Sequence, residues 1–282
     1  MDSSAKKILY IDLNSKSYEV KGETELAEYV GGVGIGLKIF SNYKEKDPII
    51  ISVGPLNGFF PYASKTSIIL SDEGVIEDIY IGGTLGSRIR FSGLDAIVIM
   101  GKSNTKVVLD ITNENASFKE SEIDLGTLGL PGMRSILAED SKGKMLIDRY
   151  FTSPERFLEK KLNEKNVHAM TITGSKTFDL KNKQKYEEIY RNLLSRTDEM
   201  HVKQFGNPSC SGCPMGCEMY KTGELGGNVL IHCLVACTYA EGIYSDIGVI
   251  FSCLNVLGYD YTHEDLEKLP KLINGLLKEI EE

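Results

Sequence analysis

Residues 91–102, "FSGLDAIVIMGK", contain an apolar, β-branched run bounded by Asp95 and Gly101. Such a run between turn-forming residues is typical of a β-strand. The chain on both sides repeats the pattern, which predicts further strands at 6–13, 16–20, 47–54, 65–71, 75–82, 105–112 and 168–174. Asn14 and Ser15 mark a turn between the first two of these strands, so we expect them to pair.

Helical patterns separate these strands and then replace them. We expect helices at 24–30, 35–43, 133–140 and 154–165, and after residue 180 at 183–200, 228–242, 245–257 and 263–281. Thr262 is the expected N-cap of the last helix, with Asp265 three residues on. The sequence therefore predicts an α+β fold with a strand-rich domain over 1–180 and a helical segment over 181–282.

Composition narrows the class of protein. Of the 282 residues, 41% are hydrophobic and 26% are charged, as is common in globular proteins. The net charge is −8 and no basic stripe interrupts it, so nucleic acid is not an expected partner. No window approaches the roughly 18 apolar residues of a membrane helix, and residues 1–13 do not resemble a signal peptide. We expect a cytoplasmic protein that does not bind membranes.

The six cysteines all lie in the last quarter of the chain. Three of them, Cys210, Cys213 and Cys217, have the spacing C-x2-C-x3-C, and Cys233 follows sixteen residues later. Iron–sulfur clusters are usually held by four cysteine thiolates, and a single loop with short spacings covers three corners of the cube. Glycines at 212 and 216 allow the tight backbone path that such a loop needs.

Two other interpretations of these cysteines remain open. Zinc sites usually use two ligand pairs, and His232 beside Cys233 keeps a zinc site as an alternative. A cysteine cluster without any metal is the third. The spacing reverses that of radical S-adenosylmethionine enzymes, so that class is set aside. Cys237 and Cys253 fall on apolar helical faces and are predicted to be buried core thiols.

The sequence resembles the tungsten-dependent aldehyde ferredoxin oxidoreductase family. The motifs that carry the resemblance follow the family's order: "KILYIDLNSKSYEV", "LAEYVGGVGIGLKIF", "ISVGPLNGFFPYASKTSIILSDEG", "YIGGTLGSRIRFSGLDAIVIMGK" and "NPSCSGCPMGC". The resemblance implies the family's N-terminal domain and a [4Fe–4S] cluster. It places Cys233, in "NVLIHCLV", as the fourth ligand beside Cys210, Cys213 and Cys217.

The resemblance also implies a tungsten or molybdenum pterin, and the sequence departs from the family where this cofactor is held. Lys65 stands where the family has an arginine. The positive charge is therefore kept, but the paired hydrogen bonds that a guanidinium can donate to a phosphate are lost. Tyr80 stands at a family asparagine. The family's glycine-rich phosphate segment is replaced by the charged residues 153–166. The residues that remain as candidates for an anionic cofactor are Lys65, Gly82, Gly83 and Arg88.

Three functions follow from these observations. The first is an electron-transfer protein with one [4Fe–4S] cluster and a degraded tungstopterin site, working with a redox partner such as ferredoxin or a larger oxidoreductase subunit. The second is a compact oxidoreductase that acts on aldehydes with a tungstopterin or molybdopterin, held in a homodimer between two chains. The third is a non-enzymatic scaffold with a structural metal. The family resemblance implies an anaerobic host.

Overall fold

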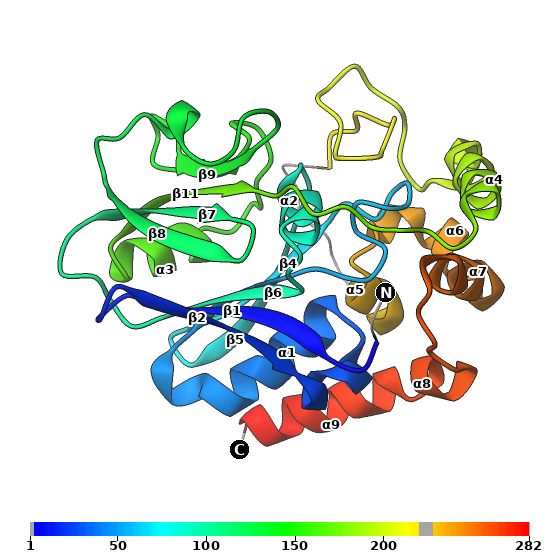
Figure 1. Ribbon diagram of the computed structural model, residues 1–282, viewed down its shortest axis with the longest axis horizontal. Helices are drawn as coiled ribbons and strands as arrows, with labels where there is room; N and C mark the ends of the chain where they lie inside the picture. The colour runs from blue at the N-terminus through cyan, green and yellow to red at the C-terminus, as the bar shows by residue number, and fades with distance from the viewer. Residues whose placement is uncertain (1–2, 220–227, 282) are drawn as a thin grey trace.

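The computed structural model describes residues 3–219 and 228–281, which form two β-sheets with helices packed around them (Figure 1). The first sheet has the strand order β2–β1–β6–β3–β4–β5. Its strands are β1 (Lys6–Asp12), β2 (Ser17–Glu23), β3 (Ile49–Ser52), β4 (Thr66–Asp72), β5 (Val75–Ile81) and β6 (Ala96–Met100). The predicted strands at 6–13, 16–20, 47–54, 65–71, 75–82 and 95–102 are therefore confirmed.

The strand β6, from the stretch "FSGLDAIVIMGK", lies in the middle of this sheet. It pairs in parallel with β1 and antiparallel with β3. Ala96 and Val98 face a core shared with helices, whereas Ile97 and Ile99 face the core between the two sheets. All four side chains are completely buried. A strand buried on both faces needs apolar residues at every position, which explains the continuous run.

A buried ion pair between Arg90 and Asp95 holds the chain in place just before β6. Helix α2 (Leu85–Phe91) carries Arg90, whose Nη1 donates to Asp95 Oδ1 at 2.9 Å, and whose Nη2 donates to the carbonyl of Gly54 at 2.8 Å. The backbone amide of Lys7 donates to the other carboxylate oxygen of Asp95. Burial alone would raise the pKa of Asp95, but the charges of Arg90 and Lys6 hold that pKa below its usual range. The pair therefore ties α2, β1 and β6 together.

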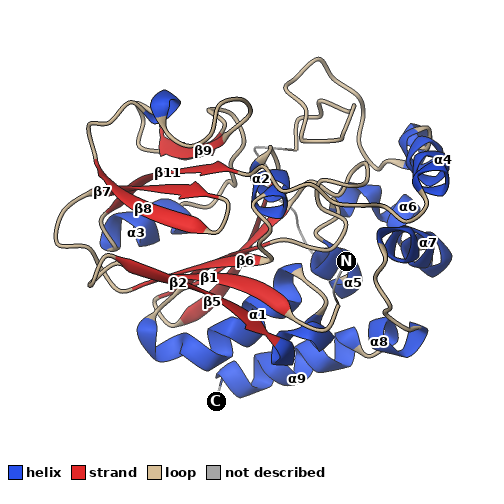
Figure 2. Cartoon of the chain, viewed as in Figure 1, coloured by secondary structure: helices blue, strands red, loops and turns tan. Residues whose placement is uncertain are grey.

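The second sheet has the order β10–β9–β11–β7–β8 and lies beside the first (Figure 2). Its strands are β7 (Val107–Thr112), β8 (Asn115–Glu120), β9 (Ser135–Glu139), β10 (Met145–Ile147) and β11 (Val167–Thr173). The predicted strands at 105–112 and 168–174 are confirmed. Two strands, β8 and β10, were not predicted.

The prediction of a helix over 133–140 was wrong, because these residues contain β9. This strand pairs antiparallel with both β10 and β11. Within it Ser135 and Leu137 are buried and alternate with half-buried Ile136 and Ala138, which is strand periodicity. Pairing with two neighbouring strands outweighs a local pattern as short as this one. The predicted helix at 154–165 is present as α3 (Phe157–Glu164).

Helices lie against the outer face of the first sheet and beyond one end of it (Figure 1). They are α1 (Gly32–Tyr43), α4 (Lys183–Leu194), α5 (Val229–Leu234), α6 (Glu241–Tyr244), α7 (Ile247–Leu257), α8 (His263–Glu267) and α9 (Leu269–Glu281). The helix α9 runs along α1 beneath the sheet (Figure 1), and both contribute to one core. Residues from both sides of position 180 share this core. The domain boundary near 180 stays a prediction.

The chain from 228 to 242 is not the single helix that the sequence predicts. The helix α5 ends at Leu234, and Val235 adopts the left-handed conformation with φ of 54°. A 3-10 turn over Thr238–Ala240 and the short α6 follow. The helix predicted over 24–30 is present as a 3-10 helix over residues 24–29. By contrast, the capping box of Thr262 and Asp265 is confirmed.

Within the described residues, no single helix is both long and apolar enough to span a membrane. One pair, Thr238–Tyr244 with Ile247–Leu257, passes the same test only when its two bent members are taken together.

Candidate metal centre

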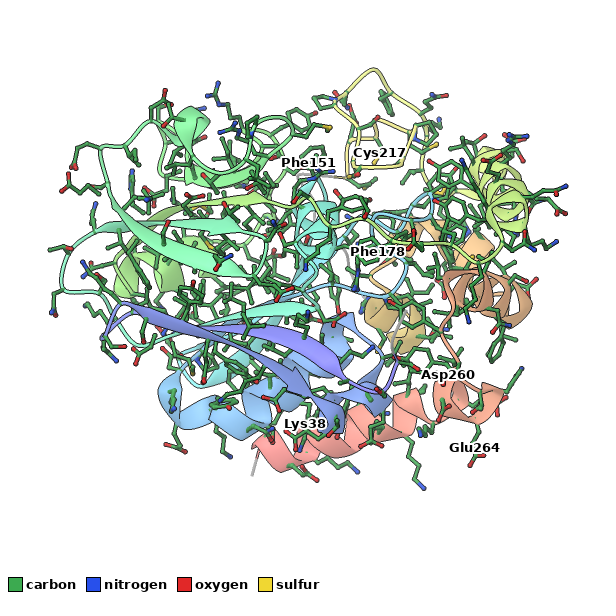
Figure 3. All side chains as sticks on the ribbon, viewed as in Figure 1. Lys38, Phe151, Phe178, Cys217, Asp260 and Glu264 are labelled. Carbon is green, nitrogen blue, oxygen red and sulfur yellow. The ribbon has the colours of Figure 1, made fainter. Side chains whose placement is uncertain are left out.

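The three-cysteine segment forms a closed loop at one end of the molecule (Figures 1 and 3). The amide of Phe205 donates to the carbonyl of Met215 at 2.9 Å, and the amide of Asn207 donates to that of Gly216 at 3.3 Å. Gly216 has a φ of +48°, and a Cβ there would lie 2.4 Å from the Asn207 carbonyl oxygen. Only glycine therefore lets the two arms of the loop approach each other.

The loop is attached to the end of β5. The amide of Ser211 donates to the carbonyl of Gly83 at 3.0 Å, and the amide of Cys213 donates to the carbonyl of Cys210 at 3.1 Å. The second bond closes a tight turn between the first two cysteines. Gly212, inside this turn, has a φ of +71°. The loop is thus fixed at one side and open to solvent at the other, where Gly212 and Pro214 are exposed.

Four cysteines line one small cavity under this loop. They are Cys210, Cys213, Cys217 and Cys237, and the cavity has a volume of about 30 Å³. Its other lining residues include Ser64, Lys65, Gly82, Phe151, Met200, Met215 and Tyr239. Of the residues predicted from the sequence, the structure therefore brings together the three loop cysteines, Lys65 and Gly82. Phe151 and Cys217 mark this end of the molecule in Figure 3.

Side chains occupy the space over the two glycines that follow β5. A Cβ on Gly82 would lie 2.4 Å from the sulfur of Cys210, and a Cβ on Gly83 would lie 2.9 Å from the ring of Phe151. Both glycines permit a close approach, and their role as candidates for an anionic cofactor stays a prediction. The atoms that approach them are the protein's own sulfur and aromatic ring.

Burial makes two of the loop thiols, those of Cys210 and Cys213, hard to ionise on their own. It raises the pKa of Cys213 to about 12, and it raises the pKa of Cys210 as well. The positive charge of Lys65, which is only 5% exposed, opposes this rise at both sulfurs. Metal ligation requires thiolates, so a bound cation would displace these protons. Lys65 would then lie beside a centre with net negative charge.

Cys233 lies away from this lining, on α5. Its side chain is completely buried, and its sulfur would lie 3.2 Å from a Cβ on Gly34. Burial raises the pKa of its thiol to about 12. The neighbouring His232 packs its ring against Tyr80, at 4.2 Å between centroids, and its Nε2 lies 3.3 Å from Thr238 Oγ1. The structure thus does not bring Cys233 to the cavity that the other three cysteines line.

Cys237 is the residue that the sequence pattern misassigned. It does not lie on a helical face but immediately precedes the 3-10 turn over Thr238–Ala240, and it is half-buried against the cavity. No glycine or proline marks the break at Val235, so the apolar pattern alone indicated a continuous helix. Cys253 is completely buried on α7, and its prediction as a core thiol is confirmed.

Arg88 lies apart from the cysteines. Its guanidinium stacks over the ring of Phe91 at 5.2 Å, and among the described residues its buried Nε has no hydrogen-bond partner. Desolvation lowers its pKa, while the carboxylate of Asp148 acts in the opposite direction.

The glycine-rich stretch at 31–36 is in close contact with helix α5, as is Gly54. A Cβ on Gly32 would lie 2.1 Å from the carbonyl oxygen of His232, and one on Gly54 would lie 2.0 Å from that of Leu234. Backbone atoms of α5 therefore rest directly on these glycines. Gly32, Gly34 and Gly36 belong to the first turns of α1, so this stretch packs against protein.

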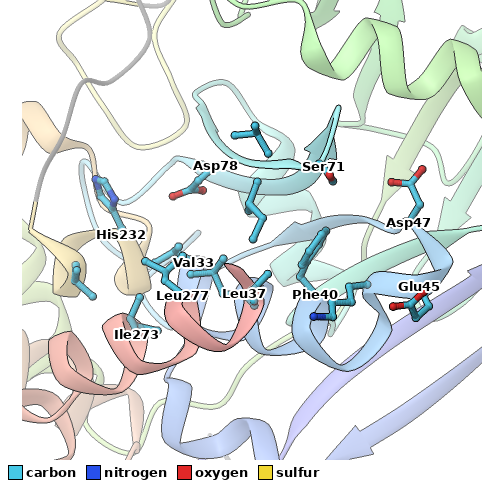
Figure 4. A pocket seen from close by; sticks show the side chains of 16 residues that line it. Val33, Leu37, Phe40, Glu45, Asp47, Ser71, Asp78, His232, Ile273 and Leu277 are labelled. Atoms are coloured by element: carbon cyan, nitrogen blue, oxygen red, sulfur yellow. The ribbon is translucent and has the colours of Figure 1, made fainter. Parts of the chain in front are cut away.

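A larger groove lies on another part of the surface. Its volume is about 800 Å³, and apolar residues of α1 and α9, among them Leu37, Phe40 and Leu277, line it (Figure 4). Asp78 and His232 border one end. The groove shares no lining residue with the cysteine cavity, and none of the predicted cofactor residues lies in it.

The thiols that line this cavity are the donor type of an iron–sulfur cluster. Within residues 3–219 and 228–281, no three His, Cys, Asp or Glu side chains converge closely enough to hold one metal ion. A zinc ion needs four donors at about 2.0–2.3 Å from one point. An iron–sulfur cube spreads its thiolates over separate iron corners, so it accepts sulfurs that lie further apart. The donor set of thiols fits this group.

Comparisons with known proteins agree with the fold. Residues 8–174 match the family described as aldehyde ferredoxin oxidoreductase, N-terminal domain. The tungsten-containing aldehyde ferredoxin oxidoreductase of Pyrococcus furiosus is 25% identical over 233 residues, which cover 71% of this chain and 38% of that protein. The WOR-like subunit of an aliphatic sulfonate oxidoreductase, from the same organism, is 30% identical over 149 residues, 47% of this chain and 24% of that one.

A solved structure has the same fold. The active-site complex BamBC of benzoyl coenzyme A reductase matches 96% of this chain and 56% of its own, with a TM-score of 0.61 at 14% identity. The chain spans about two fifths or less of the length of these two curated relatives. Because the family match covers more than half of its residues, the chain belongs to the aldehyde ferredoxin oxidoreductase family.

Proposed function

We propose that this chain is an electron-transfer protein that carries one [4Fe–4S] cluster under the loop of Cys210, Cys213 and Cys217. The observation that carries the proposal is the cavity in which these three sulfurs gather beside Lys65. The six cysteines, all within the described residues, form no disulfide. Thiols in this state suit a reducing compartment such as the cytoplasm.

The protein's own residues would hold and tune the cluster. The three loop thiolates would ligate iron, and the buried Lys65 would offset the negative charge of the ligated centre. Such a centre supplies a reversible one-electron couple, whose potential depends on nearby charge, hydrogen bonds and solvent exposure. Phe151 and the methionines 200 and 215 line the same cavity and limit the access of water.

The position of the loop supports electron transfer over a purely structural role. Cys213 and Cys217 are half-buried, and the residues between them include exposed Pro214. An electron carrier needs its centre close to a surface that a partner can reach, whereas a structural staple has no such need. The partner would be another redox protein, either a ferredoxin or a larger oxidoreductase subunit. Two proteins similar to this chain are named as a subunit and as a complex.

A tungstopterin does not fit the residues present. The surfaces of Gly82 and Gly83 that would admit a phosphate are covered by the sulfur of Cys210 and the ring of Phe151. Tyr80, at the position of the family asparagine, is buried and packs against His232. We therefore derive no reaction on an aldehyde or other oxo donor from this chain.

The metal content of protein purified without oxygen from its native host tests the proposal. We expect about four irons per chain and a reversible one-electron reduction, as for a single cube. Zinc in place of iron would support the scaffold and overturn electron transfer. Tungsten or molybdenum together with iron would show that a pterin binds, and would support the compact oxidoreductase, alone or as a homodimer.

A further inference from the structure

The cluster proposed above requires a fourth ligand, and the structure contains two cysteines near the loop that could supply it. Spacing and family resemblance favour Cys233, whereas the cavity lining contains Cys237. The two are four residues apart. In one continuous helix such residues lie on the same face. Here Val235, in the left-handed conformation, ends α5 between them and gives them different surroundings.

Two backbone hydrogen bonds hold the segment of Cys237 against the cavity wall. The amide of Cys237 donates to the carbonyl of Tyr62 at 2.8 Å, and the amide of Lys65 donates to the carbonyl of Val235 at 3.2 Å. Residues 235–237 therefore lie along residues 62–65, and Ser64 and Lys65 of that stretch line the cavity themselves. This pairing fixes Cys237 on the wall of the cavity.

Close backbone contacts of α5 hold Cys233 outside the lining of the cavity. A Cβ on Gly31 would lie 2.9 Å from the Cys233 carbonyl, and the backbone of Leu234 rests on Gly54. A rotation of α5 that carried the Cys233 sulfur toward the cavity would have to take place on these glycines. Such a rotation would drive backbone atoms into each other, because glycines were needed to admit the helix at all.

We infer that Cys237, and not Cys233, is the fourth thiolate, which gives the ligand pattern C-x2-C-x3-C-x19-C. The inference rests on the proposed cluster and names the residue that completes it. The cavity is about 30 Å³, and admitting a cube would require the loop to move outward. Residues 201–218 contain no helix or strand, and only a few backbone bonds need to adjust.

Matched alanine variants of the two cysteines test this inference. Wild type, Cys237→Ala and Cys233→Ala are reconstituted with iron and sulfide without oxygen, and iron per chain is measured with the electron paramagnetic resonance spectrum. We expect Cys233→Ala to retain about four irons, and Cys237→Ala to fall to three or fewer with a three-iron signal or none. Circular dichroism of the metal-free proteins checks that both variants fold.

The outcomes separate this inference from the proposed function. A loss of iron in Cys233→Ala with retention in Cys237→Ala overturns the inference and leaves the cluster intact. Full retention in both variants also overturns it, since the fourth ligand is then not a cysteine of this segment. A wild-type chain that binds no cluster overturns the proposed function as well. If Cys233→Ala does not fold, retention of four irons by Cys237→Ala is still sufficient to refute the inference.

Discussion

The substitution Gly82→Ala tests whether the sulfur of Cys210 must stay where the structure places it. The new Cβ would lie 2.4 Å from that sulfur, 3.8 Å from the Cβ of Cys210 and 3.6 Å from Phe151. Ordinary heavy-atom contacts are about 3.5–4.0 Å, so only the sulfur has to move, by about 1 Å. Gly82 does not have a positive φ, so alanine is compatible with the backbone.

The cost of this clash depends on whether the sulfur is bound. In the metal-free protein the side chain of Cys210 can rotate, which costs about 0.5–1.5 kcal/mol if it leaves its preferred rotamer. In the cluster-bound protein the iron–sulfur bond prevents that rotation. Overpacking that cannot relax costs about 1–3 kcal/mol. Cluster binding is weakened by the difference between these two costs, about 0.5–1.5 kcal/mol, so we expect the cluster of Gly82→Ala to bind about 2- to 13-fold more weakly.

Iron release to a chelator, followed without oxygen, measures this effect. Gly206→Ala is the matched control, because it lies on the same loop and a Cβ there meets nothing within 4 Å. Thermal unfolding of the metal-free proteins should differ little among wild type and both variants. Equal retention of iron by Gly82→Ala and Gly206→Ala would refute the role of Cys210 as a ligand held at this position.

Three further substitutions address charge and stability. Lys65→Met removes the positive charge beside the thiols and should lower the reduction potential in a redox titration; an unchanged potential would contradict its tuning role. Asp95→Asn leaves Arg90 buried without its charge partner, and should lower the free energy of unfolding in urea by about 3–5 kcal/mol. Hydrogen bonds from the Thr262 amide and hydroxyl lower the pKa of Asp265 to about 2. The ionised carboxylate therefore stabilises the helix cap near neutral pH, and this stabilisation is lost as the pH falls from about 4 towards 2. Thr262→Ala should cost about 1 kcal/mol and return that pKa towards its ordinary value in an NMR titration.

The sequence predicted the strands best where both faces are buried. The run at 96–100 leaves little alternative to a central strand, because every residue in it is apolar and most are β-branched. Residues 133–140 were assigned wrongly because β9 owes its conformation to two partner strands, which a local pattern does not reveal. Sequence indicated the family and the three-cysteine loop through motifs whose spacing is set by local geometry. The position of Cys237 depends on a left-handed valine, which no residue preference signals.

The glycines of this chain bear on the proposal that one cofactor site of the family is lost while another is kept. Glycine permits close approach, but it does not determine what approaches. At Gly32 and Gly54 the approaching group is the backbone of α5, and at Gly82 it is the sulfur of Cys210. Once a side chain fills the space beside a glycine, a phosphate can enter that space only by displacing the side chain. A metal that is bound to the side chain leaves the contact with the glycine in place. In the proposed function, the contact of the Cys210 sulfur with Gly82 serves the cluster, and the space that it fills is closed to a phosphate.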